Sequence, residues 1–159
     1  MKRLVLVGGG HAHIEVLRDL AERGDVRWAV TLVTPYPWLT YSGMVPGFFA
    51  GHYEIDQCSI DLRALGDRAN ATLVPATAIR IDTSDRAVVC DNGSAYPYDV
   101  LSLDVGTEPY GRDVRGVEQH AVVMRPLEKA VRGWSDVLVR AREGGIGSVS
   151  VVGGGAAGV

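Results

Sequence analysis

The sequence predicts an α/β fold in which a parallel sheet, built around one βαβ unit, is followed by an antiparallel β-meander. The apolar run Arg3–Val7 has no polar alternation, as is typical of a strand covered on both faces. A glycine turn, a segment with helical spacing and a second apolar run, Trp28–Val33, follow it, so these segments fit one right-handed βαβ unit. Turn residues between the later apolar runs predict the meander.

The spacing of apolar residues predicts the helices. The first helix is expected over residues 11–23 and can end at Gly24. A short helix is expected over residues 60–68. A second long helix is expected over residues 126–143, because Pro126 suits a first helical position and two glycines follow the apolar stripe.

Turn residues divide the middle of the sequence into extended runs. Thr72–Ile81 and Arg86–Cys90 are predicted strands, and the turn at Asn92–Gly93 leads to a third run, Tyr98–Leu103. Because short turns join these runs, we expect them to pair as the antiparallel meander.

Two glycine-rich turns follow apolar runs, LVLVGGGHAH at Leu4–His13 and VSVVGGGAAGV at Val149–Val159. Their G-x-G spacing is typical of the turn between a buried parallel strand and a helix whose N-terminus receives a pyrophosphate. Gly8, Gly9 and Gly10 lack Cβ atoms, which would let backbone N–H groups approach a pyrophosphate. The alternative is a turn that only joins strand to helix. Two such turns imply two dinucleotide sites.

The first turn departs from the full dinucleotide pattern at two positions. His13 stands where a third glycine normally lets the helix press against the strand, so the helix must lie further away or the imidazole must fill the gap. Thr34 replaces the usual Asp or Glu after the second strand, and its neutral hydroxyl can touch a ribose but cannot accept two hydrogen bonds on two separate oxygens as a carboxylate does. The terminal turn matches the pattern completely, with Gly153, Gly155 and Gly158.

Charge and hydropathy limit the classes of partner. The net charge of −3 and the pI of about 5.8 argue against a protein that wraps nucleic acid. No apolar run approaches the roughly 20 residues that span a bilayer, and no small-residue cleavage site follows the N-terminal residues. We therefore expect a cytoplasmic protein and leave peripheral attachment to a membrane open.

The histidines and cysteines do not predict a metal site or a dithiol pair. His11 and His13 are two positions apart at a helix start, so their side chains would point about 200° apart. For His11, a hydrogen bond to a phosphate oxygen and a partly buried packing role are equal alternatives. Cys58 and Cys90 belong to no C-x-x-C pair and are expected to be small buried hydrophobes.

The stretch from Pro35 to Asp61 has no sustained period and is rich in aromatic residues and prolines. An ordered loop of this length is usually functional. Two interpretations remain equal: the loop covers a flat apolar ring system such as an isoalloxazine or a quinone, or it forms a satellite core. The aromatic residues of this stretch are Tyr36, Trp38, Tyr41, Phe48, Phe49 and Tyr53.

With these motifs in order, the sequence resembles the flavoprotein superfamily of pyridine nucleotide-disulfide oxidoreductases with two dinucleotide domains. The resemblance is to its non-disulfide branch, especially the type II NADH dehydrogenases and the related flavoproteins sometimes fused to selenide, water dikinase. Four segments carry it: LVLVGGGHAHIEVL, TLVTPYPWLTYSGMVPGFFAGHY, YDVLSLDVGTEP and VSVVGGGAAGV.

The resemblance implies a Rossmann-like FAD-binding domain with a second flavin-contact turn at Asp104–Pro109. In the family, that turn usually has the sequence Ala-Thr-Gly. Gly106 matches this pattern, whereas Asp104 and Val105 do not. The residues implied at FAD are Gly8, Gly9, Gly10, His11 and Ala12 near the pyrophosphate, Thr34 and Pro35 near the adenosine ribose, Ala78 beside the adenine, and Gly106.

The resemblance also implies that the chain is the N-terminal fragment of a longer protein and is inactive alone. The implied organisation is an FAD-binding domain at 1–125, a connecting helix at 126–146, and the first strand and glycine turn of an NAD(P)H-binding domain at 147–159. Gly153, Gly155 and Gly158 would begin that second domain.

The expected activity is hydride transfer from NAD(P)H to FAD, followed by electron transfer to a quinone-like acceptor. Because the cofactor carries the reactivity in such enzymes, no acid, base or nucleophile is assigned. Two alternatives stay open: an enzyme like sulfide:quinone oxidoreductase, which needs reactive cysteines, and a non-catalytic redox module that binds FAD or another nucleotide. The sequence predicts no oligomeric state.

Overall fold

The computed structural model describes residues 1–24, 26–107 and 111–153, and the chain forms two compact units. Unit 1 comprises Met1–Leu39 and Ile60–Gly106, and unit 2 comprises Thr40–Ser59 and the residues from Thr107 onward. The chain leaves unit 1 along strand β3 (Trp38–Thr40) and returns along β4 (Ser59–Asp61), and these two strands form a small sheet.

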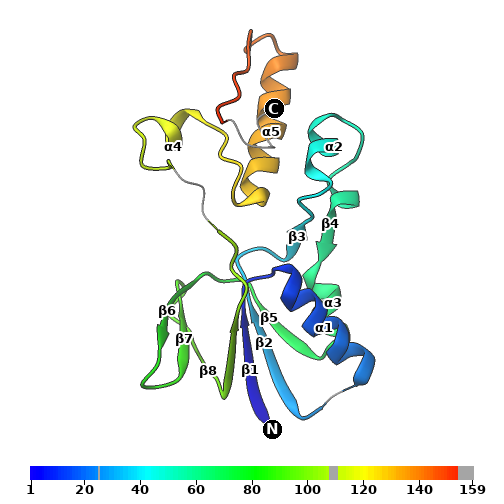
Figure 1. Ribbon diagram of the computed structural model, residues 1–159, viewed down its shortest axis with the longest axis vertical. Coiled ribbons are helices and arrows are strands. Elements are labelled where there is room, and N and C mark those ends of the chain that lie inside the picture. The colour runs from blue at the N-terminus through cyan, green and yellow to red at the C-terminus, as the bar shows by residue number, and fades with distance from the viewer. Residues whose placement is uncertain (25, 108–110, 154–159) are drawn as a thin grey trace. The chain divides into compact units, whose positions relative to one another are not determined.

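A four-stranded parallel sheet forms the centre of unit 1 (Figure 1). Its order is β5 (Ala71–Val74), β2 (Trp28–Val33), β1 (Lys2–Val7) and β9 (Val100–Leu103). β1 pairs in parallel with both β2 and β9, and β2 pairs in parallel with β5. Helix α1 (His11–Arg23) connects β1 to β2, which confirms the predicted βαβ unit and the helix bounds.

One face of the parallel sheet packs against α1 and α3 (Leu62–Arg68). Leu6 of β1 and Leu32 of β2 point to this face and contact a core that includes Leu17 of α1 and Leu62 of α3. All four side chains are almost completely buried, as expected for strands covered on both faces. The predicted short helix over 60–68 is thus confirmed, with its first two residues in β4 instead.

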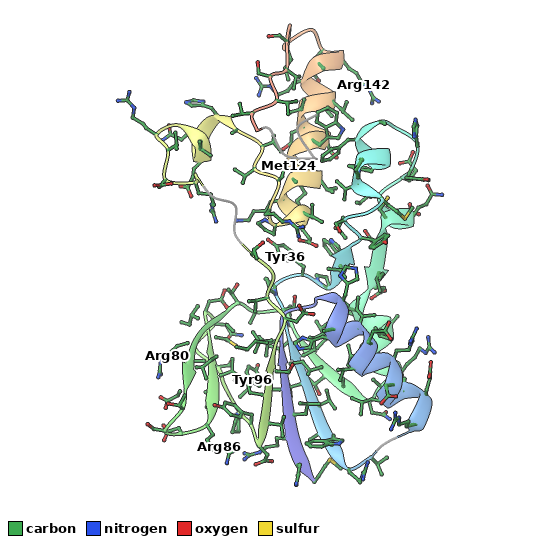
Figure 2. The ribbon with its side chains drawn as sticks, in the orientation of Figure 1. Tyr36, Arg80, Arg86, Tyr96, Met124 and Arg142 are labelled. Atoms are coloured by element: carbon green, nitrogen blue, oxygen red, sulfur yellow. The ribbon has the colours of Figure 1, made fainter. Side chains whose placement is uncertain are left out.

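The opposite face of the sheet packs against an antiparallel meander of β6 (Ala78–Asp82), β7 (Ala87–Cys90) and β8 (Ala95–Pro97). Val88 is completely buried between these layers, and Tyr96 packs against the same cluster from β8 (Figure 2). Unit 1 therefore has three layers, with the meander, the parallel sheet and the helices in that order (Figure 1).

Two predictions about the strands were wrong. Thr72–Ile81 is not one strand, because β5 ends at Val74 within the parallel sheet and β6 begins in the meander. Pro75 follows Val74, and proline cannot donate a ladder hydrogen bond. The run Tyr98–Leu103 is not the third strand of the meander: β8 takes that place, and β9 joins the parallel sheet beside β1.

Unit 2 contains α2 (Val45–Phe49), the short 3₁₀ helix η1 (Asp56–Cys58), α4 (Val117–His120) and the long helix α5 (Leu127–Arg142). α5 confirms the helix predicted over 126–143. The ring centroids of Phe49 and Trp134 lie 5.2 Å apart, and those of Phe48 and Phe49 lie 5.7 Å apart. This packing supports the interpretation of the aromatic stretch as a satellite core.

Both cysteines are free and buried, which confirms that they serve as small hydrophobes. Burial raises the pKa of the Cys90 thiol. In the described part of the chain, no helix is long and apolar enough to cross a membrane.

A salt bridge fixes the start of β9 to the start of β1. Arg3 donates hydrogen bonds to the Asp99 carboxylate from its backbone nitrogen, at 2.7 Å, and from its guanidinium, at 3.0 Å. The guanidinium and then the backbone N–H lower the pKa of Asp99 to about 2. Because the folded-state pKa lies below the ordinary value, this contact stabilises the fold above pH ~4 and is lost as the pH falls toward 2.

We therefore expect Asp99→Asn to lower the free energy of unfolding near neutral pH and to lose that effect in acid. Urea denaturation of both proteins from neutral pH down to about pH 2 measures the difference. In an Arg3→Met background, the effect of Asp99→Asn should be smaller. A difference between the two proteins that grows as the pH falls would contradict this account.

Candidate functional site

The carboxyl ends of the four parallel strands lie in one row. The pairing register aligns Val7 of β1 with Val33 on one side and with Leu103 on the other, and it aligns Val33 with Val74. The chain runs from β1 outward to β2 and β5, whereas β9 lies on the opposite side of β1. The strand order therefore reverses between β1 and β9. In open parallel sheets, ligands bind at the carboxyl edge at such a reversal.

The glycine turn Gly8–Gly10 lies at this reversal, and its close approach to neighbouring residues excludes side chains. Gly8 has a φ of +93°, and a Cβ atom there would overlap the backbone carbonyl of Asp104. A Cβ atom on Gly10 would overlap the Asp104 carboxylate, and one on Gly9 would overlap the side chain of Leu62. Because its neighbour is backbone, Gly8 needs to be glycine for a contact within the protein itself, whatever the turn binds, whereas the neighbours of Gly9 and Gly10 are the ends of side chains.

Asp104, the residue directly after β9, places its carboxylate at the N-terminus of α1. Its Oδ2 accepts hydrogen bonds from the backbone nitrogens of Ala12, at 2.9 Å, and His13, at 3.4 Å. The first N–H groups of a helix have no partner within the helix and carry partial positive charge, so they attract an anion. Gly8–Gly10, the first turn of α1 and Asp104 together are called the helix-start site below.

Asp104 is a functional candidate that the sequence interpretation did not assign. The resemblance gave it only as a departure from the Ala-Thr-Gly pattern. No local sequence pattern marked it, because its place beside the glycine turn follows only from the parallel pairing of β9 with β1. Recognising it would have required knowing that β9 pairs with β1.

His13 fills the gap that a third glycine would leave, so the imidazole replaces close helix packing. Its side chain is 1% exposed, and its ring nitrogens lie 2.7 Å from the Gly8 carbonyl oxygen and 2.9 Å from Ser102 Oγ. A carbonyl oxygen can only accept, so in the neutral ring Nδ1 donates to Gly8 and Nε2 accepts from the Ser102 hydroxyl. His13 therefore links α1 to the turn that follows β1 and to β9.

The other predicted contacts of FAD in unit 1 have different environments. Thr34 is buried, and its hydroxyl donates to the Tyr36 carbonyl at 3.2 Å in the turn after β2. A Cβ atom on Gly9 would lie 3.6 Å from Thr34 Oγ1, so the structure brings Thr34 beside the glycine turn. His11 is exposed at the start of α1, which does not support a partly buried packing role.

Pro35, Ala78 and Gly106 lie at or beyond the edge of this site. Pro35 is exposed directly after Thr34. Ala78 is half-buried at the start of β6 and packs against the core between the sheet and the meander. Gly106 has a φ of +73° with open space around its Cβ position, two residues after Asp104. Their roles at FAD stay predictions.

The terminal glycine turn is described only in part. Gly153 has a φ of +134°, whereas Gly155 and Gly158 lie outside the described residues. The described residues 147–153 form no strand, and Val152 is 97% exposed. A strand needs a hydrogen-bonded neighbour, so the first strand of a second domain stays a prediction.

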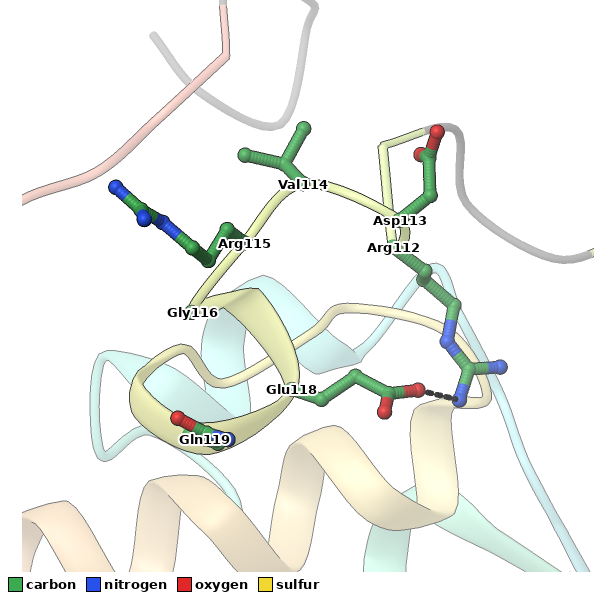
Figure 3. A pocket seen from close by; sticks show the side chains of 7 residues that line it. All are labelled: Arg112, Asp113, Val114, Arg115, Gly116, Glu118 and Gln119. Atoms are coloured by element: carbon green, nitrogen blue, oxygen red, sulfur yellow. Dashed lines mark hydrogen bonds and ion pairs between the residues drawn. The ribbon is translucent and has the colours of Figure 1, made fainter.

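A pocket of about 650 Å³ lies in unit 2, and none of the residues that line it is a predicted site residue (Figure 3). It is lined by the segment from Arg112 to Gln119, and an ion pair between Arg112 and Glu118, at 3.2 Å, crosses one side. Its lining is polar, and we assign it no function. Among the described residues, no three His, Cys, Asp or Glu side chains gather to hold a metal ion.

The known proteins that are similar to this chain in sequence or in structure are oxidoreductases. No family model matches the chain. It is 25% identical over 140 residues to the external alternative NAD(P)H-ubiquinone oxidoreductase B4 of Arabidopsis thaliana mitochondria, covering 82% of this chain and 24% of the relative. The structure of NDH2 from Plasmodium falciparum in complex with NADH superposes with a TM-score of 0.75 at 16% identity, covering 94% of this chain and 31% of that one.

The sulfide:quinone oxidoreductase of the bacterium Aquifex aeolicus superposes with a TM-score of 0.70 at 20% identity, over 89% of this chain and 33% of that one. The chain therefore shares the fold of the matching part of these two oxidoreductases. This confirms the fold class that the sequence predicted. The chain spans about a quarter of the plant relative and about a third of these two solved chains.

The glycine turn allows a test of the close approach between β1 and β9. We expect Gly8→Ala to lower the free energy of unfolding by about 3 kcal/mol or more, because a Cβ atom would overlap backbone. Gly24→Ala is the matched control: Gly24 also has a positive φ but has open space around it, so its cost should be about 1–2 kcal/mol. Chemical denaturation measures both, and equal losses would contradict the proposed overlap.

A double-mutant cycle tests the His13 bridge. His13→Leu should cost about 1–3 kcal/mol of stability, because it leaves the Gly8 carbonyl and the Ser102 hydroxyl without their partner. Combining it with Ser102→Ala removes one of the two orphaned groups, so the double variant should lose less than the sum of the single losses. Strict additivity in chemical denaturation would show that the two side chains are not coupled.

Proposed function

We propose that this chain forms the FAD-binding part of a flavoprotein that transfers a hydride from NAD(P)H to FAD and passes electrons to a quinone-like acceptor. One observation carries the proposal. The helix-start site lies at the reversal of a parallel sheet and already holds an anion, the Asp104 carboxylate, on backbone N–H groups. A pyrophosphate is an anion of the kind that this geometry attracts.

The described residues fit a dinucleotide with one adjustment, the displacement of the Asp104 side chain. Gly8–Gly10 would lie against the pyrophosphate, because the turn has no side chains to hold it away. His11 and Ala12 are exposed beside it, so a ligand can approach the helix start from solvent. Thr34 and Pro35 would face the adenosine ribose, Ala78 the adenine, and Gly106 the flavin.

FAD, when bound, supplies the hydride acceptor and the electron donor of the reaction. The residues described here would bind and orient it, and the peptide N–H groups at the start of α1 would offset its phosphate charge. NAD(P)H would bind in a following domain that begins at Gly153, Gly155 and Gly158. The plant relative, whose name gives NAD(P)H and ubiquinone, supports this donor and this class of acceptor. The same proposal places the protein in the cytoplasm, at a membrane surface where it can reach a quinone. It includes no nucleic-acid partner.

An enzyme like sulfide:quinone oxidoreductase is a second candidate, favoured by the TM-score of 0.70 to such an enzyme. That chemistry needs accessible cysteine thiolates. Cys58 and Cys90 are each 1% exposed, and burial raises the pKa of Cys90, so neither suits it. The cysteines would have to come from a longer protein. A non-catalytic redox module is the third candidate.

The absorbance spectrum of the longer protein, recorded before and after anaerobic NADH, tests the proposal. We expect bound flavin whose visible absorbance NADH or NADPH bleaches and a soluble quinone restores. Bleaching by sulfide alone would favour the second candidate, and bound flavin that no donor bleaches would favour the module. A protein that binds no flavin, even when FAD is supplied in excess, would overturn the proposal.

A further inference from the structure

We propose that Asp104 is an internal substitute for the diphosphate: it occupies the helix-start site until a dinucleotide displaces it, and its charge weakens dinucleotide binding. This inference rests on the proposed function, because it concerns the same site. It assigns to Asp104 a role in setting affinity, not a role in the reaction.

The Asp104 carboxylate occupies the place that a pyrophosphate would need. A Cβ atom on Gly10 would overlap the carboxyl carbon and both carboxyl oxygens of Asp104, so the carboxylate lies directly against the middle of the glycine turn. Its Oδ2 also takes the N–H groups of Ala12 and His13. A pyrophosphate that used the glycine turn and the first turn of α1 would need this volume and these donors. The two anions therefore compete.

The negative charge of Asp104 lowers the affinity of the site for a diphosphate. Within the described part of the chain, Asp104 forms no ion pair, and its hydrogen-bond donors are backbone N–H groups. Asp99, at the other end of β9, by contrast forms an ion pair with Arg3. A carboxylate that stayed near a diphosphate would repel it, and one that left would give up its helix contacts. Both routes lower the affinity for a diphosphate.

The attachment of Asp104 permits this displacement. Its backbone nitrogen donates to the Val7 carbonyl at 2.8 Å, so the main chain stays fixed at the end of the sheet. The side chain is only half-buried, and the following residues Val105, Gly106 and Thr107 are exposed. The carboxylate can therefore rotate away from α1 without breaking the pairing between β1 and β9.

Calorimetric titration of this chain with ADP and with adenosine tests the inference. Asp104→Asn keeps the size and one oxygen of the side chain but removes its charge. We expect it to bind ADP about tenfold or more tightly than the parent chain, the effect of removing one like charge about 4 Å from a phosphate. Adenosine has no phosphate, so its affinity should not change. Asp85→Asn, in the exposed turn between β6 and β7, is the matched control and should leave both affinities unchanged.

The outcomes separate this inference from the proposed function. If Asp104→Asn binds ADP no better than the parent chain, or more weakly, Asp104 is a structural cap or a cofactor contact and the inference is wrong while the site stands. If neither chain binds ADP, both the site and the inference are wrong. Circular dichroism checks folding, and Asp104→Ser, which also removes the charge, replaces Asp104→Asn if that variant does not fold.

Discussion

The close approach between the turn after β1 and the end of β9 is the constraint on which unit 1 depends. β1 lies between β2 and β9, and the backbone after each strand must pass within contact distance of the other. Only glycine fits at Gly8, where the backbone is left-handed and the Asp104 carbonyl occupies the space of a side chain. The same approach brings the Asp104 carboxylate to α1 and the Ser102 hydroxyl to His13. The same close approach therefore determines the pairing of β1 with β9, the position of α1 and which groups meet at the carboxyl edge of the sheet.

This arrangement changes how a G-x-G turn is interpreted. Such a turn is usually taken to be glycine-rich so that a ligand can approach the backbone. Here each of the three glycines also lies against a neighbour within the protein: the main chain of Asp104 at Gly8, Leu62 at Gly9 and the Asp104 carboxylate at Gly10. Only the neighbour of Gly8 is backbone, which cannot move aside as the end of a side chain can. A protein can thus have this motif for its own packing. The features that indicate an anion-binding site are instead the exposed start of α1 and the carboxylate that its N–H groups bind.

Local patterns predicted most elements, and long-range pairing explains the errors. The βαβ unit and α5 follow from periodicity and flanking glycines, which are properties of neighbouring residues. The division of Thr72–Ile81 between two sheets, and the place of β9 beside β1, depend on partners distant in sequence. Asp104 was missed for the same reason: its importance comes from pairing that no local pattern encodes. His13 was recognised as a departure, and the structure resolved which of its two expected consequences holds.

The order of the strands also affects how this chain can fold during synthesis. β1 precedes both of its neighbours in the chain, because its Leu4 pairs with Val30 on one side and with Val100 on the other. During translation β1 therefore has an open edge until β9 has been made, and such edges associate with other chains. Residues 40–59 of unit 2 are also made in that interval. Pairing between strands that are so distant in sequence slows folding, so this edge of β1 stays open for longer than an edge that pairs with the next strand of the chain.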